Sequence, residues 1–219
     1  MAAYERDRQG VSAETVCKGL CDLDIYNSFE KGEDVGDIHV VRLLLQRLGI
    51  SASFAGRYLC RDEYDEMHAR FNILELLRAD ELILAKTAAL EYKNRYCAGS
   101  RLNKQFMTYM NARIAQLDGD SVEALHLYKK AIGYTIEDYG VAEFTCISVY
   151  EYFMLANIAR LNAVFENYME AEKLYERLLA YCHRRNSDHW TMACVYPKTV
   201  CEMLDINSPD LSLIHISEP

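Results

Sequence analysis

The sequence predicts an all-α protein whose first sixty residues form short helices and whose later residues form long, paired helices. Apolar residues recur every three or four positions along most of the 219 residues, which is the spacing of an amphipathic helix. Only 3 prolines interrupt the chain, so long helices can run unbroken. No segment alternates apolar and polar residues for long enough to predict a strand. With 51% hydrophobic residues, the chain has enough apolar surface to build a core.

The first sixty residues are expected to form four short helices. Ser12 is suited to the N-cap of the first helix because its hydroxyl can accept a backbone N–H, and Glu14 places an acid in the first turn. Gly32 and Gly49 are suited to end the second and third helices, since glycine readily adopts the left-handed conformation found there. The four expected helices span residues 12–21, 22–31, 37–48 and 51–60.

The helices expected after residue 60 are longer, and short connections join them in pairs. The connection at residues 118–120 (Asp-Gly-Asp) allows only a tight turn, so the two helices that it joins must lie antiparallel. The expected pairs are 62–77 with 80–96, 102–117 with 121–136, and 142–165 with 168–185, and residues 188–204 begin a fourth pair.

A spacing of small and aromatic residues repeats in the second helix of each pair. Small residues let two helices approach closely, and an aromatic residue one turn later fills the space between neighbouring hairpins. The spacing resembles the tetratricopeptide repeat, with a longer period than the usual ~34 residues, and predicts a tetratricopeptide-like right-handed stack of antiparallel helical hairpins. An ordinary helical bundle is the alternative. The repeated positions are Ala85, Ala89 and Tyr92, then Ala124, Tyr128 and Ala131, then Ala171, Tyr175 and Leu178, with Ala112 and Ala159 in the preceding helices.

The net charge of −9 limits the partners that the chain can bind. Proteins that coat nucleic acid use Lys and Arg to neutralise phosphates, so the acidic balance argues against that class. The net charge does not exclude a small DNA-reading module carried on an otherwise acidic protein. No apolar run reaches about 18 residues, so we expect no membrane-spanning helix and no membrane partner.

The eight cysteines are scattered along the chain, and none forms a CxxC pair. Met1 leads directly into the charged residues 4–8 and not into a secretory signal. We therefore expect a cytoplasmic protein with reduced thiols. Cys17 and Cys21 are four residues apart, but two thiols do not complete a zinc tetrahedron, so we expect no metal and no cofactor.

The N-terminal segment carries a motif followed at fixed spacing by a second one. The motif residues are Ser12, Glu14, Val16, Phe29, Glu30 and Gly32, followed by the run Leu-Leu-Gln-Arg-Leu-Gly at residues 44–49. This pattern resembles the helix-turn-helix of Cro/repressor-type (XRE) regulators. The order of motifs as far as residue 206 is similar to the Rgg/PlcR peptide-sensing regulators. The resemblance implies a DNA-binding-like domain at residues 1–60 and a repeat domain at 61–206 whose concave surface binds a signalling peptide.

The resemblance also indicates which residues would contact double-stranded DNA. Polar side chains of a recognition helix read base edges in the major groove. Residues 1–60 contain 9 acids and 7 bases, a net charge of −2, and an acidic recognition helix is unfavourable beside phosphates. Three hypotheses therefore remain open: a working DNA-binding head, a degenerate head kept for packing or dimerisation, and an unrelated helical cap. The candidate DNA-contacting residues are Ala13, Asp24, Ile25, Asn27, Ser28 and Lys31.

The repeat domain offers candidate ligand-binding residues on the first helices of two pairs. No phosphate-binding loop, zinc-protease motif or nucleophile elbow is present, so we expect no enzyme. Arg113 and Arg160 are suited to bind a peptide carboxylate, and Asn111 and Asn157 are suited to bind the peptide backbone. The alternative is that the aromatic residues pack helix against helix. The candidates are Phe106, Tyr109, Asn111, Arg113, Phe153, Asn157 and Arg160.

These interpretations predict a transcriptional regulator that binds DNA and senses a peptide or protein ligand. The alternative is a protein–protein scaffold with a helix-turn-helix that does not bind DNA. Residues 212–219 resemble the translation of a sequencing-library adapter, so we expect a non-native tail at 207–219, with a genuine disordered tail as the alternative. If the tail is not native, the helix that would cap the repeat stack is missing, and residues 188–204 expose an apolar surface. Such a surface predicts self-association, and we expect a homodimer.

Overall fold

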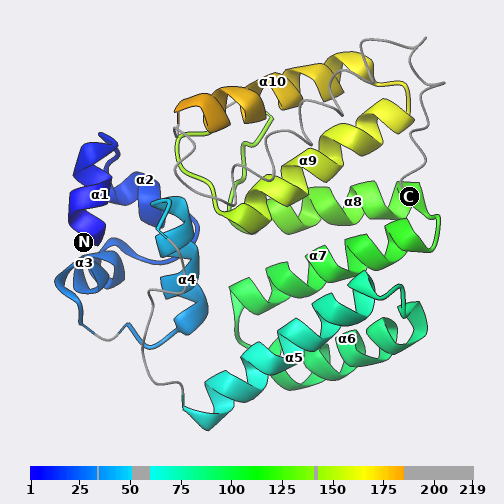
Figure 1. Cartoon of the computed structure of the whole chain (residues 1–219), viewed down its shortest axis with the longest axis horizontal. Helices are drawn as coiled ribbons and strands as arrows, with labels where there is room; N and C mark the ends of the chain where they lie inside the picture. The colour runs from blue at the N-terminus through cyan, green and yellow to red at the C-terminus, as the bar shows by residue number, and fades with distance from the viewer. Residues whose placement is uncertain (34, 51–59, 141–142, 185–219) are drawn as a thin grey trace, which may run out of the picture.

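The computed structural model of the chain describes residues 1–33, 35–50, 60–140 and 143–184 (Figure 1). Within these ranges all the regular secondary structure is helical, so the predicted all-α fold class is confirmed. None of the described helices combines the length and the apolar character needed to cross a membrane.

Over its described residues, 1–33 and 35–50, the head has four short helices packed around a small core. Tyr26 lies at its centre and is fully buried, and its hydroxyl donates a 2.8 Å hydrogen bond to Glu30. Arg6 closes the network with a 2.7 Å hydrogen bond from Nε to the same carboxylate. Ser12 caps the second helix as expected, by accepting from the backbone N–H of Thr15. The helices are α1 (Ala2–Arg8), α2 (Ala13–Cys17), α3 (Leu23–Lys31) and α4 (Ile38–Arg47).

As far as residue 184, where its described part ends, the body consists of three antiparallel hairpins stacked in chain order (Figure 1). Each helix packs against the next one along the chain, both within a hairpin and between neighbouring hairpins. Such nearest-neighbour packing is typical of repeat proteins. Their helices are α5 (Arg61–Arg78), α6 (Leu82–Tyr96), α7 (Arg101–Leu117), α8 (Ser121–Ile132), α9 (Val149–Val164) and α10 (Tyr168–Arg184).

The repeated small and aromatic residues form the centre of the body, as their spacing indicates. All nine repeated positions of α6, α8 and α10 are at most 3% exposed, and so are Ala112 and Ala159. Small side chains at these points let the helix axes approach, and the tyrosines fill the space beside them. That the stack is a right-handed tetratricopeptide superhelix stays a prediction.

The expected helix over residues 142–165 begins too early. It starts at Val149, because Ser148 and Glu151 form a capping box in which each side chain accepts the other's backbone N–H. The preceding residues 143–148 are not helical and are held by α10, where Tyr181 donates a 2.9 Å hydrogen bond to the carbonyl of Ile147. Helix α8 also ends earlier than expected, at Ile132. The expected helices at 51–60 and 188–204 fall largely or wholly outside the described residues.

A buried ion pair joins the head to the body. Arg47 of α4 and Glu151 of α9 are 104 residues apart, their side chains are each 2% exposed, and Nη2 lies 2.5 Å from Oε1. Arg47 also donates to the carbonyls of Val16 and Lys18, at 2.8 and 2.6 Å, while Glu151 accepts the backbone N–H of Ser148 at 2.6 Å. Burial alone would raise the pKa of Glu151, but the charge and hydrogen bonds of Arg47 lower it.

The turn after α2 also packs closely on the body. Gly19 has φ +75°, and a Cβ there would lie 2.3 Å from the carbonyl oxygen of Thr135. Only glycine fits this conformation and this approach together. Leu102 and Cys146 of the body also pack into the apolar core of the head. The ion pair and this contact together determine where α4 lies relative to α9.

Replacing Arg47 by Met is expected to destabilise the protein by about 3–5 kcal/mol, because Glu151 is left as an unpaired buried charge. The free energy of unfolding, measured by urea denaturation at pH 7, tests this. Arg47→Met combined with Glu151→Gln should recover part of the loss, since the amide is neutral and can still accept from Ser148.

The matched control is Lys86→Met, which breaks the ion pair between Lys86 and Asp118. Those side chains are 46% and 48% exposed, so the cost should stay below about 1 kcal/mol. Equal effects of Arg47→Met and Lys86→Met would contradict a structural role for the buried pair.

Candidate functional site

The candidate site is a groove that runs over the first helices of the three hairpins, α5, α7 and α9, and is closed at one end by α4 of the head. It has a wide part of about 510 Å³ and a narrow part of about 50 Å³, called here the groove and the chamber. The two are continuous, because Gln46, Leu74, Tyr109 and Tyr150 line both. Head and body thus contribute walls to one cavity.

Most of the predicted ligand-binding residues lie in this cavity. Phe106 is 5% exposed and lines the chamber, whereas Asn111 is exposed and lines neither part. The packing alternative holds in part for the aromatic candidates, since Phe106 and Tyr109 are buried against neighbouring rings while still bordering the cavity. The predicted residues that line the groove are Tyr109, Arg113, Phe153, Asn157 and Arg160.

The groove is positively charged although the chain is acidic. Arg78, Arg113 and Arg160 line it, and the described lining includes no Asp or Glu in either the groove or the chamber. Arg113 makes no hydrogen bond or ion pair with a described residue, whereas Arg78 pairs with the exposed Glu75. A concave surface lined by charges of one sign concentrates the electric field and attracts ligands of the opposite sign.

Asn157 is partly engaged within its own helix. Its side-chain amide donates a 2.8 Å hydrogen bond to the carbonyl of Phe153 in its own helix, and its oxygen accepts a 3.2 Å bond from Arg160. Asn157 therefore positions Arg160 across one turn of α9. One amide N–H of Asn157 is left for a ligand.

Tyrosines supply much of the apolar lining where the groove meets the chamber. The ring of Tyr109 lies 5.9 Å from that of Tyr128 and 6.0 Å from that of Tyr150, in tilted and edge-to-face arrangements. Burial raises the pKa of Tyr109 to about 12, so its hydroxyl stays neutral. Tyr128 donates a 2.7 Å hydrogen bond to Gln116, which leaves its ring face to pack against Tyr109.

A network of polar side chains supports the chamber from beneath. Nε2 of His39, on α4, lies 2.8 Å from Oε1 of Glu66, on α5, and Tyr92 donates a 2.8 Å hydrogen bond to the same oxygen. Arg70 donates to the hydroxyl of Tyr92 and to Asn103, and its guanidinium lies over the ring of Phe106. Burial would raise the pKa of Glu66, but the hydrogen bond and charge of His39, with Tyr92 and Arg70, lower it to about 2.

The candidate DNA-contacting residues lie on α3 and at the start of α2. Asp24, Ile25, Asn27 and Lys31 are exposed, and Ile25 is 39% accessible. Ala13 and Ser28 are partly exposed. The helix keeps its inner face for Tyr26, so its outer face is open to a partner.

Sequence reasoning missed several residues of the cavity. Tyr150 could have been found, because it precedes Phe153, Asn157 and Arg160 at the same helical spacing. Arg78 and Gln46 carried no such signal, since their place in the site depends on how α5 and the head pack against α7 and α9.

No protein family, curated protein or solved structure matches the chain. The described residues include no group of three or more His, Cys, Asp or Glu placed to hold a metal ion. Burial raises the pKa of the Cys21 thiol to about 11, which disfavours the thiolate that a metal or a redox reaction requires. What the cavity offers chemically is arginine, amide and aromatic groups arranged for binding.

Stability is expected to fall in acid through Glu66. Its pKa in the folded protein is about 2, below the ordinary value of 4.5, so its contribution is present above about pH 4.5 and is lost as the pH falls toward 2. Urea denaturation of the wild type and of Glu66→Gln should therefore show the largest difference at pH 7 and a clearly smaller one near pH 2.5, because the folded-state carboxylate becomes mostly protonated only below about pH 2.

Glu75→Gln is the control for this measurement, because Glu75 is an exposed carboxylate on the same helix. It should leave the stability profile of the wild type nearly unchanged. A difference between wild type and Glu66→Gln that stays constant from pH 7 to pH 2.5 would contradict the role assigned to the Glu66 carboxylate.

Proposed function

We propose that the chain is a transcriptional regulator that senses an acidic peptide in its groove and binds DNA through α3. The observation that supports the sensing role is the arginine-lined groove on an acidic protein, continuous with a chamber that the head itself helps to form. The exposed outer face of α3 supports the DNA-binding role. A homodimer would present two such heads to DNA, as is usual for helix-turn-helix proteins.

Peptide binding follows from the chemistry of the groove walls. Guanidinium groups bind carboxylates through paired hydrogen bonds, and Arg113 has no described partner that would have to be displaced. Tyr150 and Phe153 offer apolar area for peptide side chains, while Gln116 and the remaining N–H of Asn157 suit peptide backbone. A volume of about 510 Å³ lies within the range of pockets that enclose small ligands.

Short peptides with acidic residues beside a free carboxyl terminus are expected to raise the Tm of the protein in a thermal-shift screen. Arg113→Gln should weaken the binding of any such peptide about tenfold or more, because a charge-assisted hydrogen bond is lost. Isothermal titration calorimetry measures the change in Kd.

Asn111→Ala is the matched control, since Asn111 is exposed on the same helix outside the cavity lining. It should alter the Kd less than twofold. A screen in which no acidic or neutral peptide raises the Tm would count against the sensing role.

DNA binding is expected to be weak and strongly dependent on salt. A gel shift with random-sequence duplex at about 50 mM salt should show retardation, and Asn27→Ala combined with Lys31→Glu should reduce the affinity about tenfold or more. Lys86→Glu makes the same change of charge at an exposed site of the body and should have little effect. Lack of any retardation at that salt concentration would argue against a DNA-binding head.

The second candidate function is a protein-binding scaffold whose head does not bind DNA. The observation that favours it is the exposure of acids around α3, where Asp22, Asp24 and Glu33 are all accessible. These carboxylates would face phosphates in a docked complex and would weaken it. Co-purification of a stoichiometric protein partner without DNA would favour this function over the first.

A further inference from the structure

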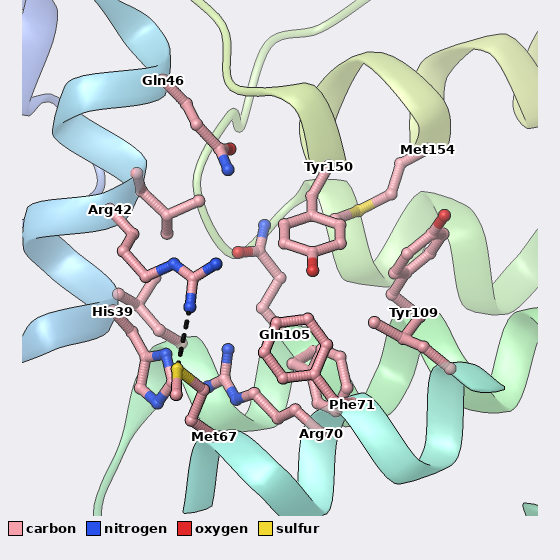
Figure 2. A pocket seen from close by; sticks show the side chains of 14 residues that line it. His39, Arg42, Gln46, Met67, Arg70, Phe71, Gln105, Tyr109, Tyr150 and Met154 are labelled. Atoms are coloured by element: carbon pink, nitrogen blue, oxygen red, sulfur yellow. Dashed lines mark hydrogen bonds between the residues drawn. The ribbon is translucent and has the colours of Figure 1, made fainter. Parts of the chain in front are cut away.

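The chamber between the head and the body is a site of a different kind from the open groove. Its walls come from four helices, α4, α5, α7 and α9, and Figure 2 shows side chains from all of them converging on one space. Its volume is about 50 Å³, room for a few water molecules or for one aliphatic side chain. It opens into the groove where Gln46, Leu74, Tyr109 and Tyr150 are shared.

The surface of the chamber is mostly apolar. Leu43, Met67, Phe71, Leu74 and Met154 contribute aliphatic, sulfur and aromatic groups. Methionine side chains adapt their shape to a guest, so two of them in one wall suit a site that closes around a side chain. Small apolar cavities bind apolar guests, because the guest restores the dispersion contacts that the empty space lacks.

The charged groups at the chamber are engaged with the protein. Arg42 donates a 3.2 Å hydrogen bond to the sulfur of Met67, drawn as a dashed line in Figure 2, and its guanidinium lies 5.8 Å from the ring centre of Phe71. Arg70 is bonded to Tyr92 and Asn103 and lies 4.6 Å from the ring centre of Phe106. These cations therefore seal the chamber, and an apolar guest does not leave them without partners.

One polar atom at the mouth of the chamber has no partner. The side-chain oxygen of Gln46 is buried and accepts no hydrogen bond from the described residues. A buried acceptor without a donor costs free energy, and a donor supplied by a ligand recovers it. Figure 2 shows Gln46 on α4 and Tyr150 on α9 facing one another, and both residues line the chamber and the groove. A peptide N–H that passes between them would meet the oxygen of Gln46.

We propose that the chamber is a subsite for one aliphatic side chain, of Val or Leu size, carried by a peptide whose acidic end lies in the groove. The Gln46 oxygen accepts a backbone N–H of that peptide at the mouth. The inference rests on the proposed peptide-binding function and adds a specificity determinant to it. Because Leu43 and Gln46 belong to α4, the bound peptide contacts the head as well as the repeat body, and its affinity depends on the position of the head.

The test uses two kinds of hexapeptide probe with a free carboxyl terminus. The reference is four glycines followed by Asp-Glu, and in the other probes one leucine replaces each glycine in turn. Burial of a leucine side chain should make at least one leucine peptide bind about tenfold or more tightly than the reference. In protein labelled with ¹³C at the methionine methyls, that peptide should shift the NMR signals of Met67 and Met154, while the exposed Met169 should not move.

Two variants locate the effect in the chamber. Leu43→Phe fills the space from α4 and should abolish the advantage of leucine while the all-glycine peptide binds as before. Gln46→Leu removes the acceptor and should weaken the leucine peptide severalfold. The all-glycine peptide and the Tm of each variant control for damage to the groove or to the fold.

The outcomes separate this inference from the proposed function. If all the peptides bind equally and Met67 and Met154 stay unmoved, while Arg113→Gln weakens every peptide, the chamber proposal is overturned and the sensing function stands. If no peptide binds, 3-methyl-1-butanol, which carries the leucine side chain, serves as a direct probe at millimolar concentration. Shifts of Met67 and Met154 would then support an apolar subsite, and their absence would overturn it.

Discussion

The ion pair between Arg47 and Glu151 is the interaction on which the arrangement of the molecule depends. Two buried charges lose their hydration, and they are tolerated only where geometry and further hydrogen bonds compensate for it. Here the guanidinium of Arg47 donates to the carboxylate of Glu151 in the body and to two backbone carbonyls of the head. The carboxylate also accepts a hydrogen bond from the backbone N–H of Ser148. The pair cannot separate without leaving a charge buried and unpaired, so α4 and α9 keep one relative position.

That constraint creates the cavity. Helix α9 lines the groove and also carries Glu151 in its first turn, while α4 carries Arg47 and also supplies Leu43 and Gln46 to the chamber. The bond that holds the head is therefore made by two of the helices that a ligand would touch. Another contact between α4 and the body, from His39 to Glu66, lies at the wall of the chamber, which His39 lines. A ligand in the chamber would contact α4, whose position is set by the Arg47–Glu151 ion pair and by the contact between His39 and Glu66.

The distribution of charge explains how an acidic protein can have a cationic cavity. Most of the acids that the structure describes are exposed, on helix faces and in the turns between helices. Arg78, Arg113 and Arg160 instead line the groove, with no acid in the described lining. Arginine suits this place because its guanidinium is weakly hydrated and stacks on aromatic rings while it offers several donors. Acids also lie around α3, where they would face the phosphates of bound DNA. Electrostatic repulsion therefore opposes DNA binding by the head more than any other part of the proposed function.

The sequence predicted the fold class and much of the groove for a local reason. Helical periodicity shows which face of each helix is apolar, and the repeated alanine and tyrosine positions of α6, α8 and α10 are all buried. The same register correctly put Tyr109, Arg113, Phe153 and Arg160 on one surface. It failed at residues 143–148, where apolar spacing continues but the capping box of Ser148 and Glu151 starts the helix later.

By itself, then, the sequence determined most of the helices, their buried faces and the position of two arginines on one surface, because these depend on residues three to seven positions apart. Only the tertiary structure decided that the head packs on α9, that Gln46 and Arg78 join the site and that a chamber lies between head and body. Those features depend on pairs such as Arg47 and Glu151, which are 104 residues apart in the sequence. Either residue could pair with many opposite charges in the chain, and only folding selects the partner.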